Sequence, residues 1–185
     1  MEACSYQGRF LHFHKKYVKN SKNIDVVWEM ISRDHDNSTQ GVYMAVKVQD
    51  NLLLNIEKRY PVDSYVLSFP GGICEDTDVV SQGLKKLKEE TGYIGCRENV
   101  TEIGPKVYSD PWKSTEKSQF ISLSVENSDK GPQGLEIAED IQPVLLPLNG
   151  LTDRLQEKSV ELQAKIDSRL FAYALGVNYG ERSRK

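Results

Sequence analysis

The sequence FPGGICEDTDVVSQGLKKLKEETGY, residues 69–93, decides how the rest of the chain is interpreted. It overlaps the run YVLSF at residues 65–69, whose β-favouring side chains predict a short strand. Pro70 offers no backbone hydrogen to a sheet, and Gly71 and Gly72 permit backbone angles that are closed to other residues. The sequence therefore predicts that the strand ends at a Gly-Gly turn.

The residues after this turn predict an amphipathic helix. Thr77 or Asp78 is suited to the N-cap, and Gly92 is suited to a left-handed C-cap. Apolar side chains recur with helical spacing on one face, at Val80, Leu84 and Leu87. This face is expected to pack against the core.

Glu89 and Glu90 are expected on the solvent-facing side of this helix, near its C-terminal end. Adjacent carboxylates are unfavourable there, because they repel each other and because the helix dipole is negative at that end. A cation beside the pair would relieve both effects.

Length and composition predict one globular domain. A chain of 185 residues and 21.0 kDa is long enough for one sizeable core. The sequence has no apolar run near the ~18 residues of a membrane span, and its start lacks the basic and apolar pattern of a secretory signal. We expect a cytoplasmic protein, with the nucleus as the alternative, and no membrane partner. A net charge of −3 argues against nucleic acid as a partner, since such proteins carry basic surfaces.

Other β-favouring runs predict the remaining strands, at residues 8–18, 24–33, 41–48, 52–59, 107–108, 119–125 and 141–148. The first pair flanks a polar turn at residues 20–23 and predicts an antiparallel hairpin. Helical spacing over residues 151–180, broken near Ile166 and Asp167, predicts a further helical pair. The expected fold class is α+β, with a mixed β-sheet sandwiched by helices and an N-terminal antiparallel hairpin extension.

We divide the chain into an N-terminal extension, a main domain and a basic tail, at residues 1–40, 41–180 and 181–185. Strand alternation in the extension places Phe10, His12 and His14 on one face. A histidine pair can bind a metal, but no third ligand lies nearby in the sequence, so a solvated face is the preferred interpretation.

The 69–93 stretch resembles the Nudix box, which ends in the pattern Arg-Glu-aliphatic-x-Glu-Glu-x-Gly-aliphatic. The match holds at Leu87, Glu89, Glu90 and Gly92, with the aromatic Tyr93 in the last aliphatic place. The resemblance implies the Nudix fold and a pyrophosphate-cleaving activity.

The box departs from the pattern where the family binds metal. Lys85 stands in place of the arginine, and Lys86 stands in place of the first metal-binding glutamate. Upstream, the spacing of the box pairs either Gly71 with Thr77 or Gly72 with Asp78, and neither alternative restores a glutamate.

The chain from residue 8 to residue 177 is similar in motif order to the ADP-ribose pyrophosphatases within this superfamily. The resemblance implies that Phe10 and Trp28 sandwich an adenine across a homodimer, that Glu29 accepts a hydrogen bond from the base, and that Arg33 holds a phosphate. On spacing alone, the preferred interpretation of Phe10 and Trp28 is ordinary core of the hairpin.

The same resemblance assigns residues around the diphosphate. Arg59 corresponds to an arginine that grips phosphate oxygens, and Asp110 to an Asp-Pro loop of the active site. Glu139 corresponds to a catalytic loop glutamate, with Glu136 and Asp140 close enough in sequence to be alternatives. A solvated strand-end arginine and a solvated loop carboxylate are the competing interpretations.

The resemblance implies that Mg²⁺ or Mn²⁺ is held by Glu89, Glu90 and the Gly71 carbonyl, with the two glutamates taking part in catalysis alongside Glu139. Lys86 and Glu90 are i and i+4, so we predict that they pair. The Lys86 ammonium would then replace part of the missing metal charge and attract a bound diphosphate.

Two functions follow. The first is a Nudix-type hydrolase of a nucleoside diphosphate derivative, with ADP-ribose cleaved to AMP and ribose 5-phosphate and with activity weakened by Lys86. The second is a catalytically inactive protein that binds or senses nucleotide sugars.

Overall fold

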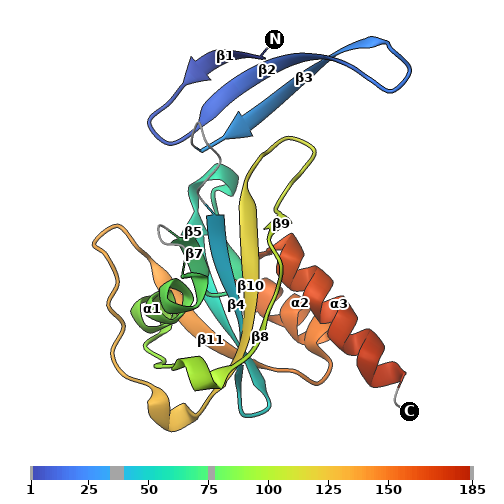
Figure 1. Cartoon of the computed structure of the whole chain (residues 1–185). Coiled ribbons are helices and arrows are strands. Elements are labelled where there is room, and N and C mark those ends of the chain that lie inside the picture. The colour runs from blue at the N-terminus through green and yellow to red at the C-terminus, as the bar shows by residue number, and fades with distance from the viewer. Residues whose placement is uncertain (1, 34–39, 75–77, 184–185) are drawn as a thin grey trace.

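The computed structural model describes residues 2–33, 40–74 and 78–183 (Figure 1). Its strands form two separate sheets, and Figure 1 shows the N-terminal sheet standing apart from the main body of the molecule. No helix among the described residues is long and apolar enough to cross a membrane.

The N-terminal sheet contains β1 (Glu2–Gln7), β2 (His12–Lys19) and β3 (Asp25–Ser32), paired antiparallel in this order. The hairpin of β2 and β3 was predicted, and its turn is closed by the Asn20 side chain, which accepts hydrogen bonds from the backbone of Lys22 and Ile24. The prediction missed β1, so the extension is larger than a hairpin.

The histidine face of this sheet is not solvated. His12 and His14 are 7% and 8% exposed, and His14 Nε2 lies 2.7 Å from the Ser32 hydroxyl. The predicted solvated face is therefore wrong, because the histidines pack inward while Phe10, which precedes β2, stays 65% exposed.

The main sheet has nine strands among the described residues, in the order β12-β6-β5-β4-β10-β8, with β11 on β5, β7 on β4 and β9 on β10. Its bounds are β4 (Gln40–Val48), β5 (Asn51–Arg59), β6 (Ser64–Ser68), β7 (Gly71–Cys74), β8 (Val100–Ile103), β9 (Val107–Tyr108), β10 (Lys117–Val125), β11 (Ile141–Pro147) and β12 (Lys165–Ile166). The β4–β10 and β6–β12 pairs are parallel and the others antiparallel, so the predicted mixed sheet is confirmed.

The α-helices are α1 (Val79–Thr91), α2 (Leu151–Glu161) and α3 (Ser168–Arg182), and short 3₁₀ turns occupy Tyr60–Val62, Arg97–Asn99 and Asn127–Asp129. One apolar core joins α1 to β4 and β10, and a second joins α2 and α3 to β5 and β6. The main sheet is thus sandwiched between α1 and the C-terminal helices, as predicted (Figure 1).

Helix α1 matches its prediction in most respects. The Asp78 carboxylate accepts a hydrogen bond from the Ser81 backbone, and Gly92 ends the helix with φ 79°, its N–H donating to the Lys88 carbonyl. Leu87 is fully buried and Val80 is 4% exposed. Thr77, the alternative N-cap, lies outside the described residues.

The expected Gly-Gly turn is wrong. Residues Gly71–Cys74 form β7, which pairs antiparallel with β4. The strand YVLSF does end before Pro70, but the chain continues into another strand because Gly71 and Gly72 can lie directly against the β4 backbone at Tyr43 and Val42.

Backbone hydrogen bonds connect the N-terminal sheet to the main body. The Ile31 N–H donates to the Lys113 carbonyl at 2.8 Å, and the Thr115 N–H donates to the Ile31 carbonyl at 3.2 Å. The end of β3 therefore lies on the loop between β9 and β10. The domain boundary at residue 40 stays a prediction.

Candidate functional site

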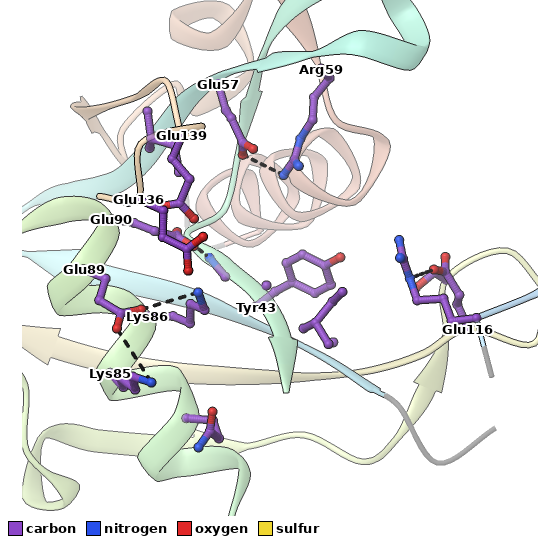
Figure 2. Close-up of a pocket in the computed structure, with 18 of the residues that line it drawn as sticks. Tyr43, Glu57, Arg59, Lys85, Lys86, Glu89, Glu90, Glu116, Glu136 and Glu139 are labelled. Atoms are coloured by element: carbon purple, nitrogen blue, oxygen red, sulfur yellow. Dashed lines mark hydrogen bonds and ion pairs between the residues drawn. The ribbon is translucent and has the colours of Figure 1, made fainter. Parts of the chain in front are cut away.

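A cavity of about 470 Å³ lies between α1, β5, β7 and the loop that precedes β11 (Figure 2). Its volume falls within the range of small-molecule sites, roughly 300–1,000 Å³. Its charged lining consists of Arg33, Arg59, Lys85, Lys86 and Lys117 with Glu57, Glu89, Glu90, Glu116, Glu136 and Glu139. Such a lining suits a polar ligand that carries charge.

Two lysines share one carboxylate on the α1 wall. Glu89 lies 3.8 Å from the Lys85 ammonium and 3.4 Å from the Lys86 ammonium, and Figure 2 shows both lysines directed toward it. Lys86 therefore forms its ion pair with Glu89. The predicted pair of Lys86 with Glu90 is wrong. The difference arises because the Glu90 carboxylate turns inward, to Asn55 and to the Gly71 N–H.

Glu90 is only 4% exposed, so its predicted place on the solvent-facing side is wrong. Its Oε2 accepts hydrogen bonds from Asn55 Nδ2 at 2.7 Å and from the Gly71 N–H at 3.0 Å. Burial raises the pKa of this carboxyl to about 7; the Gly71 and Asn55 hydrogen bonds oppose the shift, Glu57 adds to it and Lys86 opposes it. Near neutral pH, Glu90 is therefore charged in only part of the molecules.

Both predicted phosphate-binding arginines line the cavity, and each already has a glutamate partner. Arg33 Nε lies 2.5 Å from Glu116, and an Arg59 guanidinium nitrogen lies 2.7 Å from Glu57. Burial is the main cause that raises the pKa of Glu57, while Arg59 opposes the shift and Glu139 adds to it. An anionic ligand must therefore share these arginines with the glutamates or displace the glutamates from them.

Sequence reasoning missed both glutamates, although one signal was available. Glu57 and Arg59 are two residues apart in β5, so they project from the same face of that strand. Glu116, by contrast, meets Arg33 only because β3 lies on the loop before β10. No local pattern in the sequence predicts that contact.

Of the three loop carboxylates considered, two line the cavity. Glu136 and Glu139 lie together there, and Glu139 Oε2 accepts a hydrogen bond from the Glu136 backbone at 2.9 Å. Asp140 accepts a hydrogen bond from the Tyr65 hydroxyl at 2.6 Å and is not part of the lining. Glu139 is thus placed where a loop glutamate can face a bound ligand (Figure 2).

The predicted adenine-binding residues are not part of the cavity wall. Trp28 donates its indole N–H to the Trp112 carbonyl at 3.1 Å, and the two rings meet edge to face at 5.2 Å. Trp112, which is 73% exposed, was missed by sequence reasoning although it directly follows the Asp-Pro pair of the loop.

The other predicted residues outside the cavity wall are Phe10, Glu29 and Asp110. Glu29 is exposed and lies 3.7 Å from the Lys15 ammonium. The Asp110 carboxylate pairs with Lys113 at 3.1 Å, and its carbonyl accepts a hydrogen bond from the Ser114 N–H. In this chain Asp110 shapes the loop that carries Trp112.

Comparison with known proteins supports the family that the sequence of residues 69–93 resembles. No family model matches the chain. An ADP-sugar pyrophosphatase of Mus musculus is 27% identical over 191 residues, which cover 96% of this chain and 86% of that protein. An ADP-ribose pyrophosphatase of Saccharomyces cerevisiae is 27% identical over 127 residues, which cover 64% of this chain and 54% of that protein. The crystal structure of an ADP compounds hydrolase covers the whole chain with a TM-score of 0.73 at 20% identity.

The chain resembles the ADP-ribose pyrophosphatase branch of the Nudix superfamily. The structural match covers 100% of this chain and 93% of the hydrolase chain, so the shared fold includes the N-terminal sheet as well as the main domain.

The Nudix resemblance implies a divalent metal, and the residues that the structure describes do not fit one. Among residues 2–33, 40–74 and 78–183, no group of three or more His, Cys, Asp or Glu side chains is arranged to hold a metal ion. Glu89 forms ion pairs with two lysines. The buried Glu90 accepts hydrogen bonds from Asn55 and from the Gly71 N–H. Mg²⁺ requires near-octahedral oxygen ligands, and this wall supplies an ammonium among its carboxylates instead.

Proposed function

We propose that this chain binds ADP-ribose or a related nucleoside diphosphate sugar in the cavity and hydrolyses its diphosphate. The observation that carries the proposal is the convergence of Arg33 and Arg59 with Glu136 and Glu139 on one cavity of suitable size. Similarity to an ADP-sugar pyrophosphatase over 96% of the chain supports the same substrate class.

The arginines supply the binding chemistry in this proposal. A guanidinium group presents a planar fork of donors that matches two phosphate oxygens, so Arg33 and Arg59, which both line the cavity, can each bind the diphosphate. In this proposal each arginine gives up its glutamate partner and binds a phosphate oxygen instead. Both guanidinium groups are already in place before the ligand binds.

Hydrolysis adds one water across the P–O–P bridge. A new P–O bond forms to the water oxygen, the bridging P–O bond breaks, and ADP-ribose yields AMP and ribose 5-phosphate. A carboxylate on the facing loop can orient this water and accept its proton, and Glu139 is the residue that we assign to this role.

A second function has an observation of its own. The Lys86–Glu89 ion pair, and the lack among the described residues of a group of side chains arranged to hold a metal ion, favour a protein that binds the nucleotide sugar without turning it over. An ammonium supplies charge but no Lewis acid, so it favours binding without activating water.

The first prediction separates these functions. Purified protein incubated with ADP-ribose is expected to release AMP, measured by chromatography, and Arg59→Ala is expected to weaken ADP-ribose binding about tenfold because a charge-assisted phosphate contact is lost. Arg154→Ala, which removes an exposed arginine on α2, is the control and is expected to behave as the parent chain.

Binding by calorimetry without AMP release would establish the second function over the first. Neither binding nor AMP release would contradict both. Equal affinity of the parent chain and Arg59→Ala would remove Arg59 from the site.

The second prediction concerns the adenine. Trp28 and Trp112 are the two tryptophans of the chain and are in contact, so intrinsic tryptophan fluorescence reports on this pair. Because we assign the base to Trp28, ADP-ribose and AMP are expected to change the emission, whereas ribose 5-phosphate is not.

Trp112→Phe leaves Trp28 as the sole tryptophan and is expected to keep the response. An unchanged spectrum at saturating ADP-ribose, with binding verified by calorimetry, would place the base elsewhere. The family resemblance also assigns Phe10 of a second copy to the other side of the base, so a homodimer is part of this proposal.

A further inference from the structure

Lys86 is built into the cavity wall rather than extended into solvent. Its side chain is 24% exposed, and its ammonium lies 3.4 Å from Glu89 Oε2. The aliphatic part lies over the backbone of β7, because a Cβ built on Gly72 would lie 3.7 Å from Lys86 Cδ and Cε and 3.9 Å from Glu90 Oε1. The ammonium is thus directed toward the glutamates that line the cavity, with Glu89 as its partner (Figure 2).

Its electrostatic surroundings are those of a cation site. Partial burial acts to lower the pKa of Lys86, but the carboxylates of Glu89, Glu139 and Glu90 outweigh burial and hold its pKa above the usual range. Lys86 is therefore charged at neutral pH, in the place where the Nudix resemblance implies a metal.

The α1 wall places two ammonium groups beside one shared carboxylate, in a cavity that Glu57, Glu136 and Glu139 also line. Lys85 and Lys86 share the carboxylate of Glu89, whereas the buried Glu90 carboxylate accepts hydrogen bonds from Asn55 and from the Gly71 N–H. A diphosphate approaching this wall meets the Lys86 ammonium, which pairs with Glu89 and also interacts with Glu139. A divalent cation at this wall would lie beside both ammonium groups, which repel it and which already pair with the Glu89 carboxylate.

We propose that the Lys86 ammonium is the built-in cation of this cavity, so that a nucleoside diphosphate sugar binds here without a divalent metal. The inference rests on the proposed function for the identity of the ligand, and it adds that binding is independent of metal. It also explains why the acidic residues of α1 do not assemble into a metal site.

The test is the affinity for ADP-ribose, measured by calorimetry in EDTA and again in excess Mg²⁺. The unmodified chain is expected to give the same affinity in both conditions, within about twofold. An affinity about tenfold or more tighter in Mg²⁺ would overturn the inference while leaving the proposed function intact. No binding in either condition would overturn the proposed function, and the inference with it.

Variants of α1 test the residue itself. Lys86→Glu is expected to bind ADP-ribose about tenfold or more weakly in EDTA and to recover in Mg²⁺, because it restores a carboxylate and creates a metal requirement. Lys88→Glu makes the same change of charge at an exposed position of the same helix outside the cavity, and it is expected to behave as the unmodified chain.

A readout without nucleotide completes the test. Mn²⁺ alone, followed by electron paramagnetic resonance, is expected to bind Lys86→Glu and not the unmodified chain, with circular dichroism verifying that both are folded. Equal Mn²⁺ binding by the unmodified chain and by Lys86→Glu would overturn the inference, since Lys86 would then not be excluding the metal.

Discussion

Replacing Gly71 by alanine is expected to destabilise the protein by about 3 kcal/mol or more, because overpacking and backbone strain each cost about 1–3 kcal/mol. A Cβ at this position would lie 2.1 Å from the Val42 carbonyl oxygen and 2.9 Å from Tyr43 Cα. Both are backbone atoms of β4 and cannot move aside. Gly71 also has φ 150°, a conformation that L side chains rarely adopt.

The neighbouring glycine is the matched control. A Cβ on Gly72 would meet nothing closer than the Lys86 side chain at 3.7 Å, so Gly72→Ala is expected to change the free energy of unfolding by less than about 1 kcal/mol. Urea denaturation of the two variants measures the contrast. Equal midpoints would show that β7 does not lie against β4 as described.

Gly71→Ala is also expected to disturb the cavity. The Gly71 N–H is one of the donors that hold Glu90, and the paired β7 positions it there. The family resemblance implies that the Gly71 carbonyl binds metal. In this chain Gly71 also has a structural role, because it allows β7 to lie close to β4.

The sequence predicted those features that depend on local pattern. The apolar spacing of Val80, Leu84 and Leu87 placed the right face of α1 against the core, and Gly92 was correctly expected to end the helix. Both follow from helix geometry, in which side chains three and four positions apart lie on one face.

The features that sequence reasoning got wrong depend on partners far away in the chain. Helical spacing placed Glu90 in solvent, but Asn55 of β5 lies 35 positions earlier and supplies the hydrogen bond that makes burial of this carboxyl possible. Trp28 meets Trp112 across 84 positions. Periodicity predicts which face of an element is buried, but it does not identify the element that packs against that face.

Glu90→Gln is expected to become more stable than the unmodified chain as pH rises. Folding moves the pKa of Glu90 from 4.5 to about 7, so between these values the folded state binds more protons than the unfolded state. Stability therefore falls as pH rises through this window and levels off above pH 7. At about 1.4 kcal/mol per pKa unit, the loss is on the order of 3 kcal/mol.

Glutamine has no proton to lose and keeps an oxygen that accepts from Asn55 and Gly71, so the variant escapes this loss. The measurement is the free energy of unfolding in urea at pH 5 and at pH 8, with Glu157→Gln as the control for removal of an exposed glutamate. The advantage of Glu90→Gln over the unmodified chain should grow by about 2–3 kcal/mol between the two pH values. A difference that stays constant would mean that Glu90 ionises as readily in the folded protein as in the unfolded chain.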